Sequence, residues 1–219
     1  MTNDDALDPR WASAVTLREL GELVAEWLEG RMASAPFYGG PPDSETATIA
    51  PVLARLNRSG FVTDFSQPAE SDDEWAQRAA VCGYCEHDVA ERLASLSVRG
   101  ELVVVSQPAG YDAPYQLPIT RTRNYTFTIL CGDHAPSADD DDSWPWPGLH
   151  PQMREVLLAT WYVSACDPVW GRPDVLWQAL AAAIIRPVDD VRGSLIDPDY
   201  IEAQGDDWLG PLSTRCPRT

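Results

Sequence analysis

The stretch LNRSGFVTDFSQP, residues 56–68, decides the fold, because a predicted helix ends and a predicted strand begins within it. The helix begins near Pro51, and Asn57 and Gly60 are typical of its end. The strand FVTDFSQ follows, with Thr63 and Ser66 placed among apolar residues. Packing alone gives no reason for hydroxyl groups there, so both residues are candidates for a functional site.

The segment upstream, TLRELGELVAEWLEG at residues 16–30, predicts an amphipathic helix. Thr16 and Glu19 have the spacing of a capping box, and Gly30 is expected to end the helix. A loop rich in proline and glycine then leads to Glu45 and Thr46. Such a loop can present a carboxylate to a pocket instead of leaving it on a helix surface.

Downstream, short apolar runs rich in branched and aromatic residues alternate with amphipathic segments. We expect strands within residues 75–85, 101–108 and 124–132, a helix end that leads into a strand within residues 157–168, and helices at 86–96 and 173–185. This pattern predicts an α/β (or α+β) fold: a layered single domain with a mixed sheet of about five strands flanked by helices. We expect residues 1–35 to form a helical segment packed on a domain of residues 36–186, and 187–219 to form an irregular wrap.

The charge balance limits the possible partners. The 16 basic and 34 acidic residues give a net charge of −18 at pH 7, which repels nucleic acid and anionic lipid. An acidic interaction protein that mimics nucleic acid is an alternative, although solvated loops explain the clustered acids equally well. No apolar run approaches the roughly 20 residues that span a bilayer, and the first residues are acidic. We therefore expect a cytoplasmic protein that binds neither nucleic acid nor membrane.

Five cysteines, an odd number, favour reduced thiols over a disulfide framework. Cys82 and Cys85 form a CxxC pair, and Cys131 with His134 forms CxxH, which together supply the ligands of a tetrahedral zinc site. Packed, reduced cysteine is the competing interpretation, because residues three apart on a strand point to opposite faces. A redox role would need a thioredoxin-like context, which is only partly present.

No GxSxG, P-loop, GxGxxG or HExxH motif occurs in the sequence. The classes of enzyme that these motifs identify are therefore disfavoured. Trp144, Trp146 and Trp161 could stack on a flat ligand, although tryptophan beside proline more often anchors a loop on a core.

Taken together, DSETATIAPVLARLNRSGFVTDFSQP resembles the C-terminal regulatory domain of eukaryotic methylenetetrahydrofolate reductase, which binds S-adenosylmethionine. That family has a Glu-Thr pair, a helix ending in Asn-Arg-x-Gly and a strand containing Thr-x-x-Ser-Gln-Pro. Later segments, including EHDVAERLASLSVRGELVVVSQ, NYTFTILCG and WYVSACDPVWGRPDVLWQAL, resemble further elements in the same order, over about residues 36–185. The pattern is also associated with short actinobacterial proteins.

The resemblance implies that Glu45, Thr46, Thr63 and Ser66 bind S-adenosylmethionine or S-adenosylhomocysteine, with Thr126 as a further ligand-binding residue. The chemistry agrees, since the ligand's sulfonium and ammonium favour a carboxylate and its ribose favours hydroxyl partners. The alternative is that Thr63 and Ser66 only cap the strand and its turn. The family's glycine-rich stretch after Ser-Gln-Pro is replaced here by the acidic PAESDDEWAQ, and the reductase barrel has no counterpart, so flavin binding is not expected.

Two functions follow from the resemblance. The first is a stand-alone S-adenosylmethionine/S-adenosylhomocysteine-binding protein, acting as a sensor or as an accessory subunit of a partner protein. The second is an enzyme that uses S-adenosylmethionine, most plausibly a small-molecule methyltransferase. Asp64, His87, His134 and Asp167 are possible general bases for it, and their spacing selects none of them. Whether the chain is an enzyme stays open at this point.

Overall fold

The computed structural model describes residues 7–72, 74–100, 102–111, 117–122, 125–130 and 146–185, with the backbone alone for 126–130. The predicted wrap at residues 187–219 lies outside these residues, and the predicted domain borders stay predictions. The helices are η1 (Trp11–Ser13), α1 (Leu17–Leu28), η2 (Ser44–Thr48), α2 (Ala50–Arg58), α3 (His87–Val98), α4 (Pro151–Leu158) and α5 (Val175–Ile184). The strands are β1 (Phe61–Gln67), β2 (Glu70–Ser71), β3 (Trp75–Gln77), β4 (Ala80–Cys85), β5 (Val103–Pro108), β6 (Pro118–Thr122), β7 (Thr126–Leu130) and β8 (Trp161–Cys166).

The predicted layered α+β class is confirmed, but the sheet differs from the prediction. The strands form two four-stranded sheets, ordered β1-β4-β8-β5 and β2-β3-β6-β7, in place of one mixed sheet of about five strands. Every strand pair between the described residues is antiparallel. Neighbouring strands of the main sheet come from distant parts of the sequence, and pattern reading does not determine such pairings.

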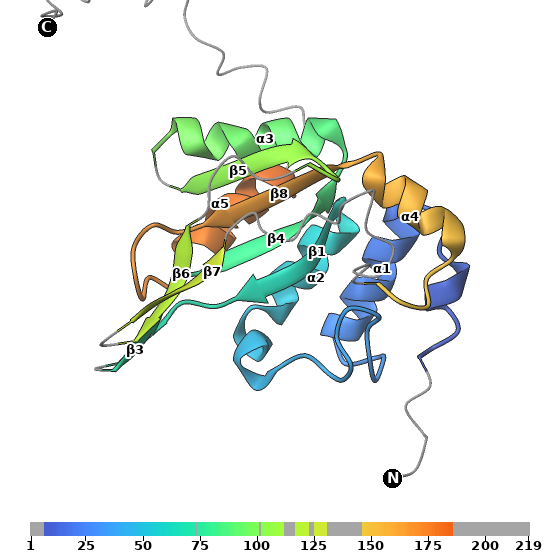
Figure 1. Ribbon diagram of the computed structural model, residues 1–219, viewed down its shortest axis with the longest axis horizontal. Coiled ribbons are helices and arrows are strands. Elements are labelled where there is room, and N and C mark those ends of the chain that lie inside the picture. Colours follow the sequence, from blue (N-terminus) through green and yellow to red (C-terminus); the bar gives the residue numbers. More distant parts are fainter. Residues whose placement is uncertain are drawn as a thin grey trace, which may run out of the picture. The chain divides into compact units, whose positions relative to one another are not determined.

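Helices α2, α3 and α5 pack against one face of the main sheet, and α1 packs on α2 and on the edge strand β1 (Figure 1). The capping box predicted for α1 is present: Glu19 N donates to Thr16 Oγ1 at 3.2 Å, and Thr16 N donates to Glu19 Oε2 at 3.0 Å. Gly30, just past the helix, has a φ of 75°, which suits glycine. None of the described helices has both the length and the apolar character needed to cross a membrane.

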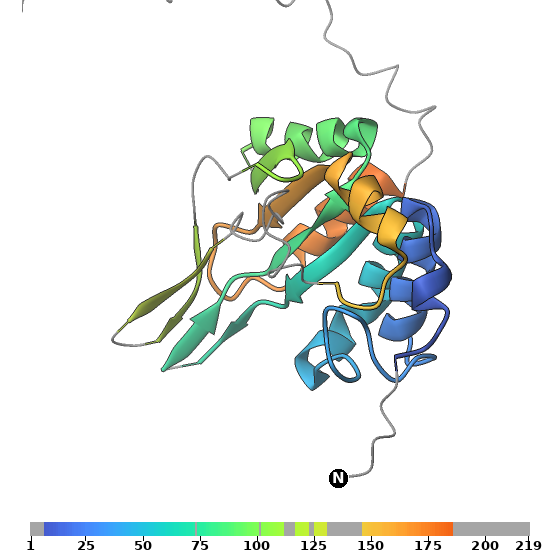
Figure 2. The same cartoon turned by 45° about the vertical axis from the view of Figure 1, so that its right-hand side comes forward.

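The second sheet extends from one end of the main sheet, as the turned view shows (Figure 2). The chain passes from β1 to β2 and from β3 to β4 with only two residues between the strands, so two neighbouring segments run through both sheets. Two buried glutamines bind backbone oxygens at this junction. Gln67 Nε2 donates to Arg78 O at 2.9 Å and to Ile119 O at 3.0 Å, and Gln77 Nε2 donates to Pro68 O at 2.9 Å. These side-chain bonds tie together the backbone segments that connect the two sheets.

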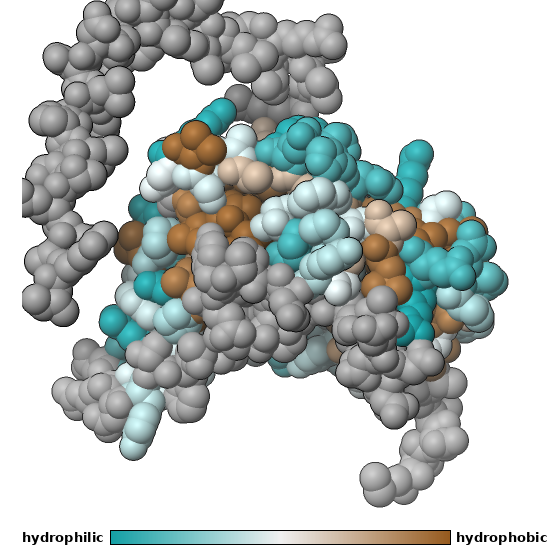
Figure 3. Space-filling model, turned by 45° about the horizontal axis from the view of Figure 1, so that its top comes forward, coloured by the Kyte–Doolittle hydropathy of each residue, from teal (hydrophilic) through white to brown (hydrophobic). Residues whose placement is uncertain are grey.

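Aromatic residues fill the part of the core that lies beside β1 and β4. Tyr84 makes edge-to-face contacts with Tyr162 and Trp146, and Trp146 lies 4.5 Å from Phe37 between ring centroids. Trp27 of α1 continues the series with Phe37 at 5.3 Å. The face of the molecule shown in Figure 3 carries hydrophilic and hydrophobic patches beside one another. The aromatic series thus joins α1, the loop after it and the sheet into one core.

Candidate functional site

A β-bulge in β1 shapes the candidate site. The pairing between β1 and β4 shifts between Thr63 and Phe65, so Asp64 is left without a partner residue on β4. Gly83 of β4 permits this close approach, since a Cβ there would lie 2.3 Å from Val62 O and 2.8 Å from Thr63 Cα. The glycine therefore allows β1 to bend and present the side chain of Asp64.

The hydroxyl of Thr63 has a structural partner. Asn57, at the end of α2, donates from Nδ2 to Thr63 Oγ1 at 2.9 Å and accepts from Thr63 N at 3.0 Å. Both side chains are buried, so these bonds lock the end of the helix to the first half of the strand. The hydroxyl of Thr63 therefore has a structural role in the strand, because its bonds to Asn57 hold the bulge in place.

A cavity of about 470 Å³, which includes its opening to solvent, lies beside this bulge. The lining comes from α1, the following loop, η2 and β1: Trp27, Leu28, Phe37, Tyr38, Asp43, Thr46, Thr63, Asp64, Phe65 and Ser66. The structure thus brings together three of the five residues predicted to bind a ligand.

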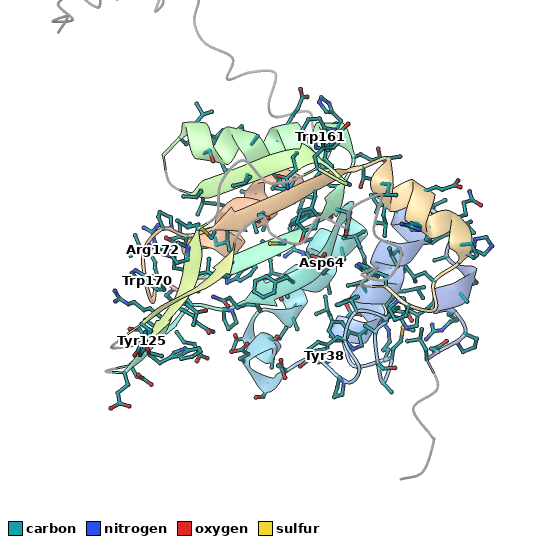
Figure 4. All side chains as sticks on the ribbon, viewed as in Figure 1. Tyr38, Asp64, Tyr125, Trp161, Trp170 and Arg172 are labelled. Atoms are coloured by element: carbon teal, nitrogen blue, oxygen red, sulfur yellow. The ribbon has the colours of Figure 1, made fainter. Side chains whose placement is uncertain are left out.

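Asp64 is half-buried in the wall of this cavity (Figure 4). Burial raises the pKa of its carboxyl group to about 7, although the Tyr162 hydroxyl, which donates to Oδ1 at 3.2 Å and to Oδ2 at 3.3 Å, opposes the shift. Burial also raises the pKa of the phenols of Tyr162 and Tyr84 well above the ordinary value. Tyr162 therefore remains a proton donor, while Asp64 changes charge near neutral pH.

Tyr38 and Asp43 lie on the loop side of the cavity. A hydrogen bond to Asp43 raises the pKa of the Tyr38 phenol above its ordinary value. The indole nitrogen of Trp27 donates to Gly40 O at 2.9 Å, which fixes the ring against the same loop. Ser66 lines the cavity with a half-buried hydroxyl that makes no hydrogen bond among the described residues. That group is free to bind a ligand.

Of the other two predicted ligand-binding residues, Glu45 is not among the described lining residues, and only the backbone of Thr126 is described. Glu45 is exposed on η2, next to the lining residue Thr46, and its Oε2 accepts from Gln77 Nε2 at 3.3 Å. Thr126 begins β7 of the second sheet, where its backbone lies opposite Arg121. The role predicted for each of these two residues stays a prediction.

The residues of the predicted zinc site fall partly outside the described chain. Cys82 and Cys85 are buried on β4, three residues apart on a strand whose pairing with β8 is regular, so their side chains point to opposite faces. Burial raises the pKa of the Cys85 thiol to about 12. Cys131 and His134 lie outside the described residues, among which no cluster of three or more potential metal-ligating side chains occurs.

Of the three possible general bases that the structure describes, Asp64 alone lines the cavity. Asp167 is fully buried and forms a two-bond ion pair with Arg172 at 2.6 and 2.7 Å, so its carboxylate organises the turn after β8. His87 stacks edge-on against Trp161 at 5.0 Å between ring centroids.

Of the tryptophans that could stack on a flat ligand, Trp146 is in the core. Trp144, like the possible base His134, lies outside the described residues. The described tryptophans therefore anchor the fold at separate places.

Pattern reading missed most of the cavity wall. Trp27 belongs to the amphipathic helix predicted at residues 16–30, a pattern that indicates packing and not ligand binding. Asp43 and Tyr38 belong to a loop without a motif. The sequence contains one indication for Asp64. It is an acidic residue inside the Thr-x-x-Ser motif of a strand that also contains apolar residues. Its partner Tyr162 is 98 residues away in the chain, so no local pattern could have joined the two.

The comparison with known proteins finds a partial similarity to methylenetetrahydrofolate reductase 1 of Schizosaccharomyces pombe (strain 972 / ATCC 24843). The two sequences are 36% identical over 59 residues, which is 27% of this chain and 10% of the relative. The match thus spans one tenth of that enzyme's length, and it supports a relationship to part of it.

A family model covers far more of the chain. It matches residues 6–186, which include every described helix and strand. The chain belongs to the family described as "Domain of unknown function (DUF6919)".

Proposed function

We propose that this chain binds S-adenosylmethionine or S-adenosylhomocysteine and acts as a sensor or as an accessory subunit of a partner protein. The observation that carries the proposal is the cavity beside the β1 bulge. It unites Thr46, Thr63 and Ser66, three residues that the resemblance implies for ligand binding, although η2 and β1 are separated by α2. The partial similarity to methylenetetrahydrofolate reductase 1 supports the same interpretation.

The chemistry of the lining suits such a ligand. Aromatic rings offer faces for an adenine base, hydroxyl groups of Thr46 and Ser66 suit ribose, and the carboxylates of Asp43 and Asp64 suit a cationic amino-acid portion. Glu45 precedes the lining residue Thr46, and it remains part of the proposal as a further residue that contacts the ligand. We expect no flavin, because the resemblance is to the regulatory domain and does not include the reductase barrel.

The test is titration calorimetry of both ligands with the full chain, paired with thermal unfolding. A ligand present at 100 times its Kd should stabilise the protein by about 2.7 kcal/mol. Ser66→Ala removes a hydroxyl from the cavity and should weaken binding, whereas Ser95→Ala on the exposed side of α3 should not. Neither heat nor thermal stabilisation by either ligand at concentrations far above micromolar would rule the proposal out.

A second candidate function is methyl transfer to a small molecule, and the position of Asp64 favours it. An acceptor would attack the methyl carbon, the S–CH3 bond would break with its electrons retained by sulfur, and Asp64 would take the proton of the acceptor. A pKa of about 7 suits a general base at neutral pH. Incubation with methyl-labelled S-adenosylmethionine and a mixture of small metabolites tests it. Label transfer that is lost in Asp64→Asn would support an enzyme, and intact ligand would support a sensor.

A further inference from the structure

The cavity beside the β1 bulge has a consistent electrostatic character. The ten lining residues that the structure describes include four aromatic side chains, two carboxylates and no arginine, lysine or histidine. Asp43 and Asp64 form no ion pair among the described residues, in contrast to the surface acids near Arg10, Arg58 and Arg92. The described part of the chain therefore supplies no cation that pairs with either carboxyl group.

The aromatic rings add to this character. Trp27 lies 5.3 Å from Phe37 and 5.9 Å from Tyr38 between ring centroids, so three rings from two elements meet at one side of the cavity. The faces of such rings carry partial negative charge and attract cations, including onium groups. The hydrogen bond between Tyr38 and Asp43 holds a carboxylate beside these rings.

Asp64 supplies the second carboxyl group of the lining, from β1. The ionisable groups that face it from neighbouring strands are Tyr162 and Tyr84, with Cys82 close to both phenols. Tyr38 and Asp43 face the cavity from the loop. None of these groups is a cation, so a positively charged ligand is the counter-charge that the ionised form of Asp64 lacks.

Resting on the proposed function, we propose that this cavity recognises the positive charge of its ligand and binds the sulfonium S-adenosylmethionine more tightly than the uncharged thioether S-adenosylhomocysteine. Asp64 is the counter-ion, and the rings of Trp27 and Tyr38 complete the cation site. The α-ammonium group is common to both ligands, so it does not contribute to the difference. A protein with this preference reports the methylated, sulfonium form of the ligand instead of its demethylated thioether.

The preference should depend on pH through Asp64. Its carboxyl group has a pKa of about 7, raised by burial, so about a tenth of it is ionised at pH 6 and most of it at pH 8. Binding of a sulfonium requires the ionised form and releases a proton at pH 6. We expect the affinity for S-adenosylmethionine to rise about tenfold from pH 6 to pH 8, while the ratio to S-adenosylhomocysteine rises with it.

The experiment measures the ratio of the two affinities by calorimetry at pH 6 and pH 8. For the natural chain at pH 8 the ratio should be about ten to a hundred in favour of S-adenosylmethionine. Asp64→Asn keeps the size of the side chain and an acceptor for Tyr162, so the ratio should fall close to one and lose its pH dependence. Glu91→Gln, an exposed carboxylate on α3, is the matched control and should leave the ratio unchanged.

The outcomes are separable. Binding of neither ligand contradicts the proposed function itself, whereas equal affinities in the natural chain, or an unchanged ratio in Asp64→Asn, overturn the charge preference alone. If Asp64→Asn does not fold, Asp43→Asn serves as a second variant and should lower the ratio in the same direction. Sinefungin, which carries an amine in place of the sulfonium, should bind like S-adenosylmethionine if charge is the feature recognised.

Discussion

The side-chain amide of Asn57 forms two hydrogen bonds with Thr63, one to its hydroxyl at 2.9 Å and one from its backbone nitrogen at 3.0 Å. The pair fixes the angle at which β1 leaves α2, one residue before the bulge that presents Asp64. A strand hydroxyl that looked like a ligand contact therefore has a structural task as well.

The first prediction concerns this pair. Asn57→Ala leaves the buried hydroxyl and N–H of Thr63 without their partner, and the free energy of unfolding should fall by about 2 to 4 kcal/mol. Thr63→Val removes the hydroxyl that accepts from Asn57 Nδ2, but that amide still donates to Leu53 O. We therefore expect the free energy of unfolding to fall by about 1 to 2 kcal/mol. Urea denaturation measures both, with exposed Thr48→Val as the control. Natural stability in Asn57→Ala would mean that the bulge is held by other contacts.

The second prediction concerns Gly83. A methyl group there would meet the backbone of Val62 and Thr63 well inside contact distance, so Gly83→Ala forces β1 away from β4. We expect a loss of about 1 to 3 kcal/mol and weaker ligand binding. Gly39→Ala is the matched control, because a Cβ at that position meets nothing within 4 Å. Thermal unfolding of the two variants decides the matter, and equal melting temperatures would contradict the role of Gly83.

The third prediction is a dependence of stability on pH. Because the pKa of Asp64 is about 7 in the folded chain and about 3.9 in an unfolded one, the folded state holds the proton more strongly between these values. This contribution to stability is complete below about pH 4 and is lost as the pH rises towards 7, by at most about 4 kcal/mol. Asp64→Asn should flatten the fall between pH 5 and pH 7 in urea denaturation. An identical slope in the variant would show that Asp64 does not titrate there.

The fourth prediction concerns Glu45, which the sequence singled out and which precedes the lining residue Thr46 on η2. If it contacts the ammonium or ribose of the ligand, Glu45→Gln should weaken binding by about 1.5 to 3 kcal/mol. The stability of the ligand-free chain should change by less than about 0.5 kcal/mol, because the side chain is exposed and glutamine still offers an acceptor to Gln77. Calorimetry and thermal unfolding measure the two effects. Unchanged affinity here and in Ser66→Ala would indicate that the resemblance records shared ancestry of fold, with the working site elsewhere.

The sequence by itself determined the elements whose signals are local. The capping box at Thr16 and Glu19 predicted where α1 begins, and apolar periodicity predicted α3, α5 and the core strands of the main sheet. A resemblance resting on Thr-x-x-Ser-Gln-Pro predicted Thr46, Thr63 and Ser66, which the structure places around one cavity. Caps, periodicities and short motifs involve residues within a few positions of one another, so one sequence is enough to read them.

Only the tertiary structure decided the division into two antiparallel sheets, the bulge at Asp64 and the environment of its carboxyl group. Strand order depends on pairings between distant segments, and Gly83 acts through the backbone of a strand that precedes it by about twenty residues. The charge of Asp64 near neutral pH depends on burial and on Tyr162, neither of which appears in the local sequence. A pKa is a property of the surroundings that folding assembles, and for that reason the position of the acid could be read from the sequence but its protonation chemistry could not.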